Sequence, residues 1–314
     1  MRVSWTKSLC LASLLASSVT ALYIEPAELH SLVARELPQE WRGFDNSERD
    51  QQKIMKISQA FRDMDTMSSD EQTALIVLGH YFSPAQKTSG DFTQKQIVLQ
   101  VLKNMVFPKN LKSHNAGSDF LAGLTIHNAL DKGTCSDLDT QGKKRTIAAY
   151  TESNDCDTSI YFCDIDRVNP YKYPDLSNLP TDEAQCREVF KKDAKVSPEM
   201  TPLAYILIHE LTHTCEVSEA PFDNAKVPGN LKVTDDPAYG PQGTRALKYK
   251  QEKGQYPSTK HVLLGPVENA DSYAWFVVEA YFSLLCGQKF EAPTSNQLVR
   301  DGICPKGPNQ CTVM

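Results

Sequence analysis

Residues 201–213 read TPLAYILIHELTH, and this is the stretch whose structure the sequence specifies best. Thr201 is favourable at the N-cap of a helix, and proline is favourable at the first helical position, which Pro202 would occupy. The pattern therefore predicts a helix that begins here and carries the rest of the stretch. On such a helix His209 and His213 are four residues apart and lie on the same face.

Two histidines on one helical face can bind a single metal ion. Their ring nitrogens could both reach a zinc ion at the usual distance of about 2.0–2.1 Å. Glu210 is rotated by about 100° from His209, so it lies outside that coordination shell but can take a proton from a metal-bound water. This HExxH pattern is typical of zinc hydrolases. The alternative is a surface helix with incidental histidines.

A catalytic zinc site takes a third protein ligand and leaves one position for water. The candidates are Asp236, in the segment DPAYG at residues 236–240, and Glu268 and Asp271, at the start of a long helix expected to end at Cys286. A thermolysin-like enzyme would use a helix-borne glutamate, whereas an enzyme with an aspartate ligand would use Asp236 or Asp271. Asp236 is favoured, because an acid beside a Tyr-Gly turn lies on a loop that can fold over a metal.

The remaining pattern predicts an α+β fold. Helices are expected where apolar residues recur at helical spacing, and strands where short apolar runs lie between polar segments. The small sheet is expected to lie over the helix of residues 201–213, which packs against the helix that begins near Glu268. Helices are predicted at 45–67, 71–82 and 93–107, strands at 146–150 and 159–163, and a polar loop at 169–183.

Residues 1–21 have the pattern of a secretory signal peptide. Arg2 and Lys7 precede a short apolar run at residues 9–16, and small residues at 19–21 supply a cleavage site. The apolar run is too short to span a bilayer. We therefore expect a secreted, extracellular protein without a membrane anchor.

Cysteine usage agrees with export. Removing Cys10 with the signal leaves eight of the nine cysteines, an even number that suits four disulfides in an oxidising compartment. None of the eight lies between residues 22 and 134. This distribution divides the chain into a helical N-terminal region, residues 22–115, which is an accessory domain or a pro-segment, and a disulfide-stabilised catalytic domain, residues 116–314.

The composition limits the partners of the chain. Its 314 residues are 40% hydrophobic and 23% charged, with a formal net charge of −6, which excludes disordered and collagenous classes. A mildly acidic surface repels phosphate backbones, so nucleic acid is not an expected partner. We expect a monomer that acts on protein or peptide substrates.

Four short blocks of the sequence resemble those of a known family. They resemble the aspzincins, the deuterolysin-like and lysine-specific metalloendopeptidases that are secreted largely by fungi. The blocks follow one another in the family's order. They are IYFC at 160–163, HELTH at 209–213, DPAYG at 236–240 and NADSY at 269–273.

The resemblance implies a zincin-like catalytic domain that holds one Zn²⁺ per chain. Asp271, unless it is itself the third ligand, would be a support group whose carboxylate accepts an imidazole N–H from a ligand histidine. Tyr161 is similar to a family tyrosine that matters for activity, and its alternative is a buried strand aromatic. The residues that the resemblance assigns directly are the zinc ligands His209, His213 and Asp236, the general base Glu210, and Tyr239 beside the scissile carbonyl.

Two positions depart from the family pattern. The family's turn motif begins with Gly-Thr four residues before its aspartate, and this chain has Lys232-Val233 there, which weakens the assignment of Asp236. In the lysine-specific members an acid three positions beyond the later aspartate helps to bind the substrate lysine. Ala274 occupies that position here, so a preference for lysine is not expected.

The sequence thus predicts a secreted zinc metalloendopeptidase. Zinc would lower the pKa of a bound water towards about 7, Glu210 would accept its proton, and Tyr239 would donate a hydrogen bond to the developing oxyanion. The competing hypothesis is a secreted zinc-binding or zinc-scavenging protein that keeps a protease-like scaffold without proteolysis. Glu210 favours the enzyme, because a metal carrier needs no base beside its first histidine.

Overall fold

The computed structural model describes most residues from Glu40 to Glu291. The predicted signal segment lies outside the described residues, as does the first part of the predicted N-terminal region. The described ranges are 40–68, 71–86, 93–106, 123–130, 135–138, 144–154, 157–165, 169–190, 195–219, 233–235, 238–253 and 265–291.

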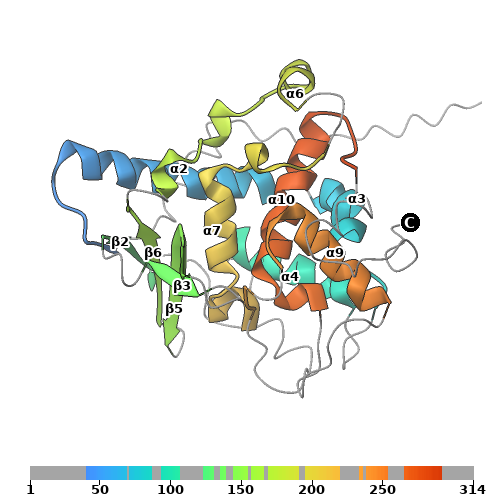
Figure 1. Ribbon diagram of the computed structural model, residues 1–314, viewed down its shortest axis with the longest axis horizontal. Helices are drawn as coiled ribbons and strands as arrows, with labels where there is room; N and C mark the ends of the chain where they lie inside the picture. Colours follow the sequence, from blue (N-terminus) through green and yellow to red (C-terminus); the bar gives the residue numbers. More distant parts are fainter. Residues whose placement is uncertain are drawn as a thin grey trace, which may run out of the picture. The chain divides into compact units, whose positions relative to one another are not determined.

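A four-stranded mixed sheet forms one layer of an α+β fold (Figure 1). Its strand order is β1-β2-β6-β5, in which β1 pairs with β2 and β2 with β6 in parallel, while β5 pairs with β6 antiparallel. Side chains alternate between the two faces of a strand, and Ile126, Ile160 and Phe162 are completely buried on the face that joins the core. The strands are β1 (Glu40–Arg42), β2 (Thr125–Ala129), β5 (Ala149–Asn154) and β6 (Asp157–Cys163).

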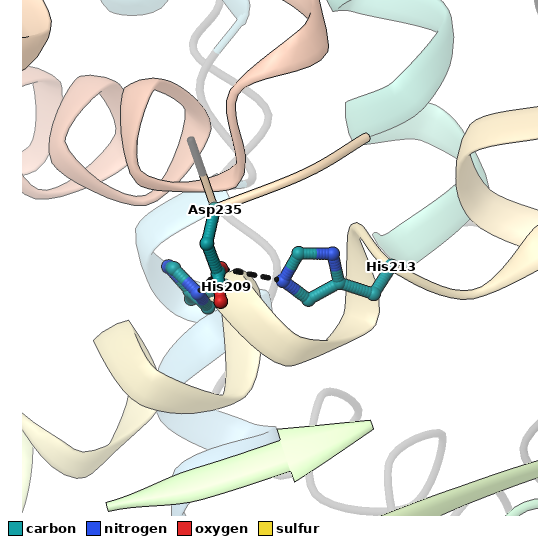
Figure 2. Close-up of side chains that lie close together, drawn as sticks. All are labelled: His209, His213 and Asp235. Atoms are coloured by element: carbon teal, nitrogen blue, oxygen red, sulfur yellow. Dashed lines mark hydrogen bonds and ion pairs between the residues drawn. The ribbon is translucent and has the colours of Figure 1, made fainter. Parts of the chain in front are cut away.

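Helices make up most of the rest of the described fold, and α7 (Leu203–Leu211) lies between the sheet and other helices. It contacts β5 on one side and α2 and α10 on the others, so that it lies between the sheet and the long C-terminal helix. His209 and His213 project from its C-terminal end (Figure 2). The other helices are α2 (Glu48–Ser68), α3 (Glu71–Tyr81), α4 (Gln94–Val106), α6 (Glu183–Val189), α9 (Gly240–Glu252) and α10 (Ala270–Leu285).

One hydrophobic core joins regions that the sequence divides into two. Ile57 of α2 and Val101 of α4 are completely buried in the same cluster as Leu207 of α7 and Phe276 of α10. The boundary predicted between residues 115 and 116 lies outside the described residues. Helices α2, α3 and α4 nevertheless contribute side chains to the core around α7, so removing them as a pro-segment would expose that core to water.

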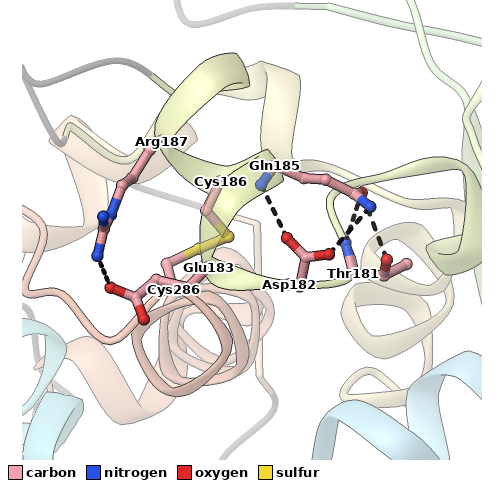
Figure 3. The surroundings of a disulfide bond; sticks show 7 residues. All are labelled: Thr181, Asp182, Glu183, Gln185, Cys186, Arg187 and Cys286. Carbon is pink, nitrogen blue, oxygen red and sulfur yellow. Dashed lines mark hydrogen bonds and ion pairs between the residues drawn. A yellow bond between two sulfur atoms is a disulfide. The ribbon is translucent and has the colours of Figure 1, made fainter.

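Two disulfides among the described residues join separate elements, one on the sheet side and one between helices. Cys135 is bonded to Cys163 at the end of β6. Cys186 of α6 is bonded to Cys286, which follows α10 (Figure 3). Cys215 is disulfide-bonded as well. Among the described residues, every helix is too short or too polar to span a bilayer.

The observed elements confirm most of the predicted ones, with shifts at their ends. The predicted strand at 146–150 is split between β5 and the strand β4 (Lys144–Thr146), which pairs with β3 (Ser136–Leu138) in a separate hairpin. The long helix expected from Glu268 begins at Ala270, because the side chain of Asn269 accepts a hydrogen bond from the Ser272 N–H and so caps it. The sequence patterns did not predict strands β1, β2 and β3 or helices α6 and α9.

Candidate metal centre

The end of α7 fixes the spacing of the two histidines. The regular helix stops at Leu211, and the next turn tightens, because the His213 N–H donates to the carbonyl of Glu210 at 3.1 Å. His213 therefore stays one turn above His209, and their ring centroids are 5.2 Å apart. The HExxH spacing thus places both imidazoles on one side of the chain, as the sequence predicts.

Asp235 meets both histidines. Its Oδ1 atom lies 2.7 Å from Nε2 of His209 and 3.0 Å from Nε2 of His213 (Figure 2). One ligand atom from each of the three residues lies within 4.8 Å of the other two. Among the described residues, this is the one group of histidine, cysteine and acidic side chains so arranged that it could hold a metal ion.

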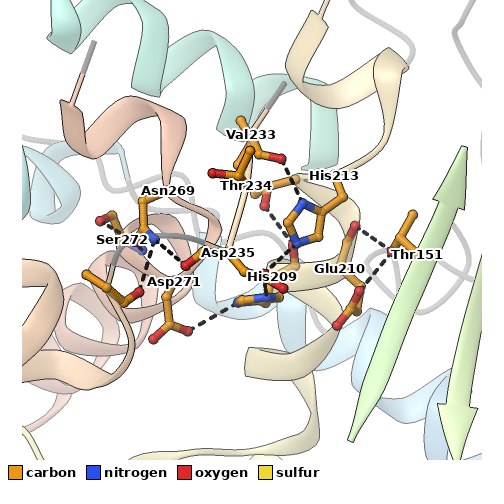
Figure 4. Close-up of polar contacts among 12 residues, drawn as sticks. Thr151, His209, Glu210, His213, Val233, Thr234, Asp235, Asn269, Asp271 and Ser272 are labelled. Carbon is orange, nitrogen blue, oxygen red and sulfur yellow. Dashed lines mark hydrogen bonds and ion pairs between the residues drawn. The ribbon is translucent and has the colours of Figure 1, made fainter. Parts of the chain in front are cut away.

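The other nitrogen of each ring has a separate acceptor. Nδ1 of His209 lies 3.2 Å from Oδ1 of Asp271, and Nδ1 of His213 lies 2.9 Å from the carbonyl oxygen of Val233 (Figure 4). A ring that donates its Nδ1 proton to such an acceptor has an Nε2 lone pair free for a metal. Both tautomers therefore suit a metal ligand.

The donor set fits a zinc ion. Two imidazole nitrogens and one carboxylate oxygen are the ligands of many catalytic zinc sites. In a tetrahedral zinc site the ligand atoms are about 3.3 Å apart. The observed separations of 2.7 Å and 3.0 Å are shorter, so the three side chains would have to open slightly around an ion.

The three side chains of the group differ in their exposure to solvent. The side chains of His209 and His213 are 12% and 17% exposed, whereas the side chain of Asp235 is 45% exposed. Water or a substrate can therefore approach from the side of Asp235, as a catalytic metal with an open position requires.

Hydrogen bonds between the rings and the carboxylate shift the pKa values of His209 and Asp235 in the metal-free group. Burial lowers the pKa of His209, but its hydrogen bonds to Asp235 and Asp271 outweigh burial, so that this pKa is well above the ordinary value. Burial raises the pKa of Asp235, but hydrogen bonds to the two histidines outweigh it and hold this pKa far below the ordinary range. At neutral pH the metal-free group therefore contains a charged pair, and a divalent cation would replace its proton.

Neither the protein-family models nor the curated proteins compared with this chain match it. The chemistry of the centre therefore has to be inferred from its own side chains.

Glu210 lies beside the two histidines and faces the sheet. It is 5% exposed, and the hydroxyl of Thr151 on β5 lies 2.9 Å from its Oε2 and 3.0 Å from its carbonyl oxygen (Figure 4). Burial raises the pKa of Glu210, and the nearby His209 and His213 only partly offset that rise. A carboxylate whose pKa is raised is a stronger proton acceptor.

Asp271 lies on the other side of His209 from Asp235. Its Oδ1 contacts the His209 ring and the hydroxyl of Tyr205, and its Oδ2 accepts a hydrogen bond of 2.5 Å from the Gly240 N–H. Asp271 is 1% exposed and is not part of the three-residue group. Asp271 can therefore orient the His209 ring.

The other predicted site residues have different locations. Asp236 lies outside the described residues. Tyr239 directly precedes α9, with 42% of its surface exposed. Glu268 lies in a short 3-10 turn before α10, where its carbonyl accepts a hydrogen bond from the Thr234 N–H. The structure does not bring Glu268 into the three-residue group.

Tyr161 lies on the outer face of the sheet. Its neighbours Ile160 and Phe162 point into the core with α7, so its own side chain points the opposite way. There it stacks between His127, at a centroid distance of 4.1 Å, and Tyr150, at 4.5 Å. The structure therefore does not bring Tyr161 to the three-residue group.

The sequence patterns do not predict three residues of the centre, which are Asp235, Thr151 and Asn269. The adjacent pair Asp235-Asp236 was a usable signal, because successive side chains of an extended segment point to opposite sides and only one of the two would face the histidines. Thr151 and Asn269 gave no signal of this kind. Their roles depend on contacts between elements that are far apart in the sequence.

Proposed function

We propose that this protein is a secreted zinc-dependent endopeptidase that hydrolyses peptide bonds. The observation that carries the proposal is the buried carboxylate of Glu210 beside the converging ligand atoms of His209, His213 and Asp235. The aspzincin resemblance of the sequence blocks agrees with it. In place of Asp236, which the resemblance favours, we propose Asp235 as the third ligand.

The three ligands would hold one zinc ion at the exposed side of the group. A bound zinc ion would supply a Lewis acid that polarises a water molecule and a peptide carbonyl. Asp271 and the carbonyl of Val233 would hold the two rings by their Nδ1 protons.

Glu210 is proposed as the general base. The Thr151 hydroxyl has one proton, and donating it to Oε2 leaves Oε1 of Glu210 as the acceptor for the proton of the attacking water. Glu210 would then pass this proton to the amine that leaves. Thr151 would keep the carboxylate in one orientation through both steps.

Tyr239 is proposed to donate a hydrogen bond to the oxyanion that develops on the substrate. The residue follows the segment of Asp235 closely, and its partial exposure leaves it accessible to a substrate. Removing one oxyanion donor typically costs about 3 kcal/mol of transition-state stabilisation.

An extended peptide is the substrate class that suits the surroundings of Glu210. In the described sheet β5 is the last strand, and it carries Thr151 next to the proposed base. The outer edge of such a strand offers backbone donors and acceptors to a peptide, which can pair with it as an added strand. The disulfides of the chain agree with an extracellular location.

The competing proposal is a zinc-binding protein without proteolysis, because three ligands alone suffice to bind the ion. Peptide hydrolysis distinguishes the two. The purified protein is expected to cleave a casein or peptide mixture, to lose this activity with a chelator and to regain it with zinc. Mass spectrometry of the products reports the cleavage preference, and zinc uptake without any hydrolysis would favour the binding protein.

A further inference from the structure

Asn269 lies next to the metal centre but contacts neither histidine. It is completely buried in front of α10. Its Nδ2 atom donates to two backbone carbonyls, those of Asp235 and Ala238, each at 3.0 Å (Figure 4). One side-chain amide therefore holds the chain on both sides of the segment between these two residues.

The other half of the amide is used as well. Its Oδ1 accepts hydrogen bonds of 2.9 Å from both the backbone N–H and the hydroxyl of Ser272. Two acceptors lie at the nitrogen and two donors at the oxygen, so the hydrogen bonds fix the orientation of the amide. Asn269 thus has two separable functions, a cap on α10 and a clamp on the segment that carries Asp235.

Backbone contacts place the same segment against α10. The Thr234 N–H donates to the carbonyl of Glu268 at 2.7 Å, and the Ala270 N–H donates to the carbonyl of Thr234 at 3.0 Å. One residue earlier, the Val233 carbonyl accepts from His213. The segment of residues 233–235 is therefore fixed at its backbone, whereas the carboxylate of Asp235 is 45% exposed and touches only the two rings in the described contacts.

We propose that Asn269 is a positioning residue for the metal centre, because it holds the backbone of Asp235 where its carboxylate meets His209 and His213. The inference rests on the proposed zinc site. An aspartate side chain has two rotatable bonds, so its carboxylate can be placed only if its backbone is placed. Positioning groups of this kind typically change metal affinity about 10- to 100-fold.

The test compares substitutions that separate the clamp from the cap. Asn269→Asp and Asn269→Ser both remove the amide donors and keep an oxygen that is favourable at the N-cap. Ser272→Ala removes one hydrogen bond at the cap and leaves the clamp intact. We expect both Asn269 variants to bind zinc about 10- to 100-fold more weakly in competition with a chromophoric chelator, and Ser272→Ala to bind it as the unaltered protein does.

A double-mutant cycle shows whether the effect passes through Asp235. In an Asp235→Ala background the Asn269 substitutions are expected to cause no further loss of zinc affinity. Unchanged affinity in the single Asn269 variants, or an equal loss in both backgrounds, would overturn the inference. So would unfolding of both Asn269 variants while Ser272→Ala folds. If the unaltered protein takes up no zinc, the proposed function itself fails, and this outcome is distinct from the others.

Discussion

Helix α10 carries two buried carboxylates, and they lie in different surroundings. Asp271 and Glu279 are 1% and 0% exposed, and each lies beside a histidine ring. Oδ1 of Asp271 is 3.2 Å from Nδ1 of His209, and Oε1 of Glu279 is 2.5 Å from Nδ1 of His80. Each carboxylate also accepts a hydrogen bond from a tyrosine hydroxyl. By these contacts alone, the two clusters look alike.

The difference lies in what surrounds each histidine. Beside His80, the guanidinium of Arg245 pairs with Glu279 and approaches the ring nitrogen. A fixed positive charge of this kind repels a cation. Beside His209, the second ring nitrogen faces Asp235 and a second histidine. A histidine on a buried carboxylate is therefore a structural contact by default, and it becomes a candidate metal ligand only when further ligands converge on its other nitrogen.

The largest effect is expected from substituting Glu210, the proposed base beside the metal centre. Glu210→Gln should lower turnover by about 10²- to 10⁴-fold, because the proton acceptor is lost. Zinc binding should be unchanged, because the ligands are intact. Initial rates of peptide hydrolysis and the zinc content of the same preparation measure both quantities. Loss of zinc from this variant would make Glu210 a ligand rather than a base.

A substitution in the cluster of His80, Glu279 and Arg245 is expected to lower the stability of the protein and to leave metal binding unchanged. Glu279→Gln leaves the buried charge of Arg245 without its partner, which should lower the free energy of unfolding by about 3–5 kcal/mol. Zinc affinity should stay that of the unaltered protein. Urea unfolding of the zinc-free protein, followed by chelator competition on the folded variant, measures the two. A fall in zinc affinity here would show that the clusters are coupled.

The matching substitution of Asp271, beside His209, is expected to weaken zinc binding and to affect stability less. Asp271→Asn removes the carboxylate that accepts from His209, and we expect zinc affinity to fall by about 10- to 100-fold. The amide oxygen can still accept from the Gly240 N–H, so folding should be affected less than in Glu279→Gln. Complete loss of zinc binding would instead identify Asp271 as a direct ligand.

The smallest expected effect is a dependence of the zinc affinity on pH. Because hydrogen bonds hold the pKa of His209 well above its ordinary value, its ring is protonated in the metal-free protein at neutral pH. Zinc must displace this proton, so its apparent affinity should rise with pH, by up to about tenfold per pH unit for one proton. Calorimetric titrations in buffers of different ionisation enthalpy count the protons released. Affinity that falls as pH rises would contradict this.

The sequence alone was sufficient to predict the part of the centre that lies within one segment of the chain. The sequence predicts the helix that carries His209 and Glu210, and the structure confirms it with shifted ends: the N-cap is Pro202 in place of Thr201, and the helix stops at Leu211, two residues before His213. Helices α2, α3 and α4 are likewise predicted by local sequence patterns. These features depend on residues that are close together in the chain.

The rest depends on contacts between distant segments. The segment of Asp235 is held by hydrogen bonds to residues about 34 positions later, among them that of Asn269 to the Asp235 carbonyl. Thr151 reaches Glu210 because β5 forms the edge of the sheet beside α7, a relation that spans 59 residues. Tyr161 points away from the centre because the opposite face of β6, with Ile160 and Phe162, packs into the core that contains α7. A pattern read along one segment carries no information about such pairings.

The central claim is that His209, His213 and Asp235 together bind one divalent ion, and zinc titration of an adjacent pair of variants tests it most directly. Asp235→Ala and Asp236→Ala remove carboxylates one residue apart, so each is the control for the other. We predict that the unaltered protein and Asp236→Ala each bind one zinc ion, whereas Asp235→Ala loses tight binding. Retention of zinc by Asp235→Ala, or a failure of the unaltered protein to bind zinc at all, would contradict the claim.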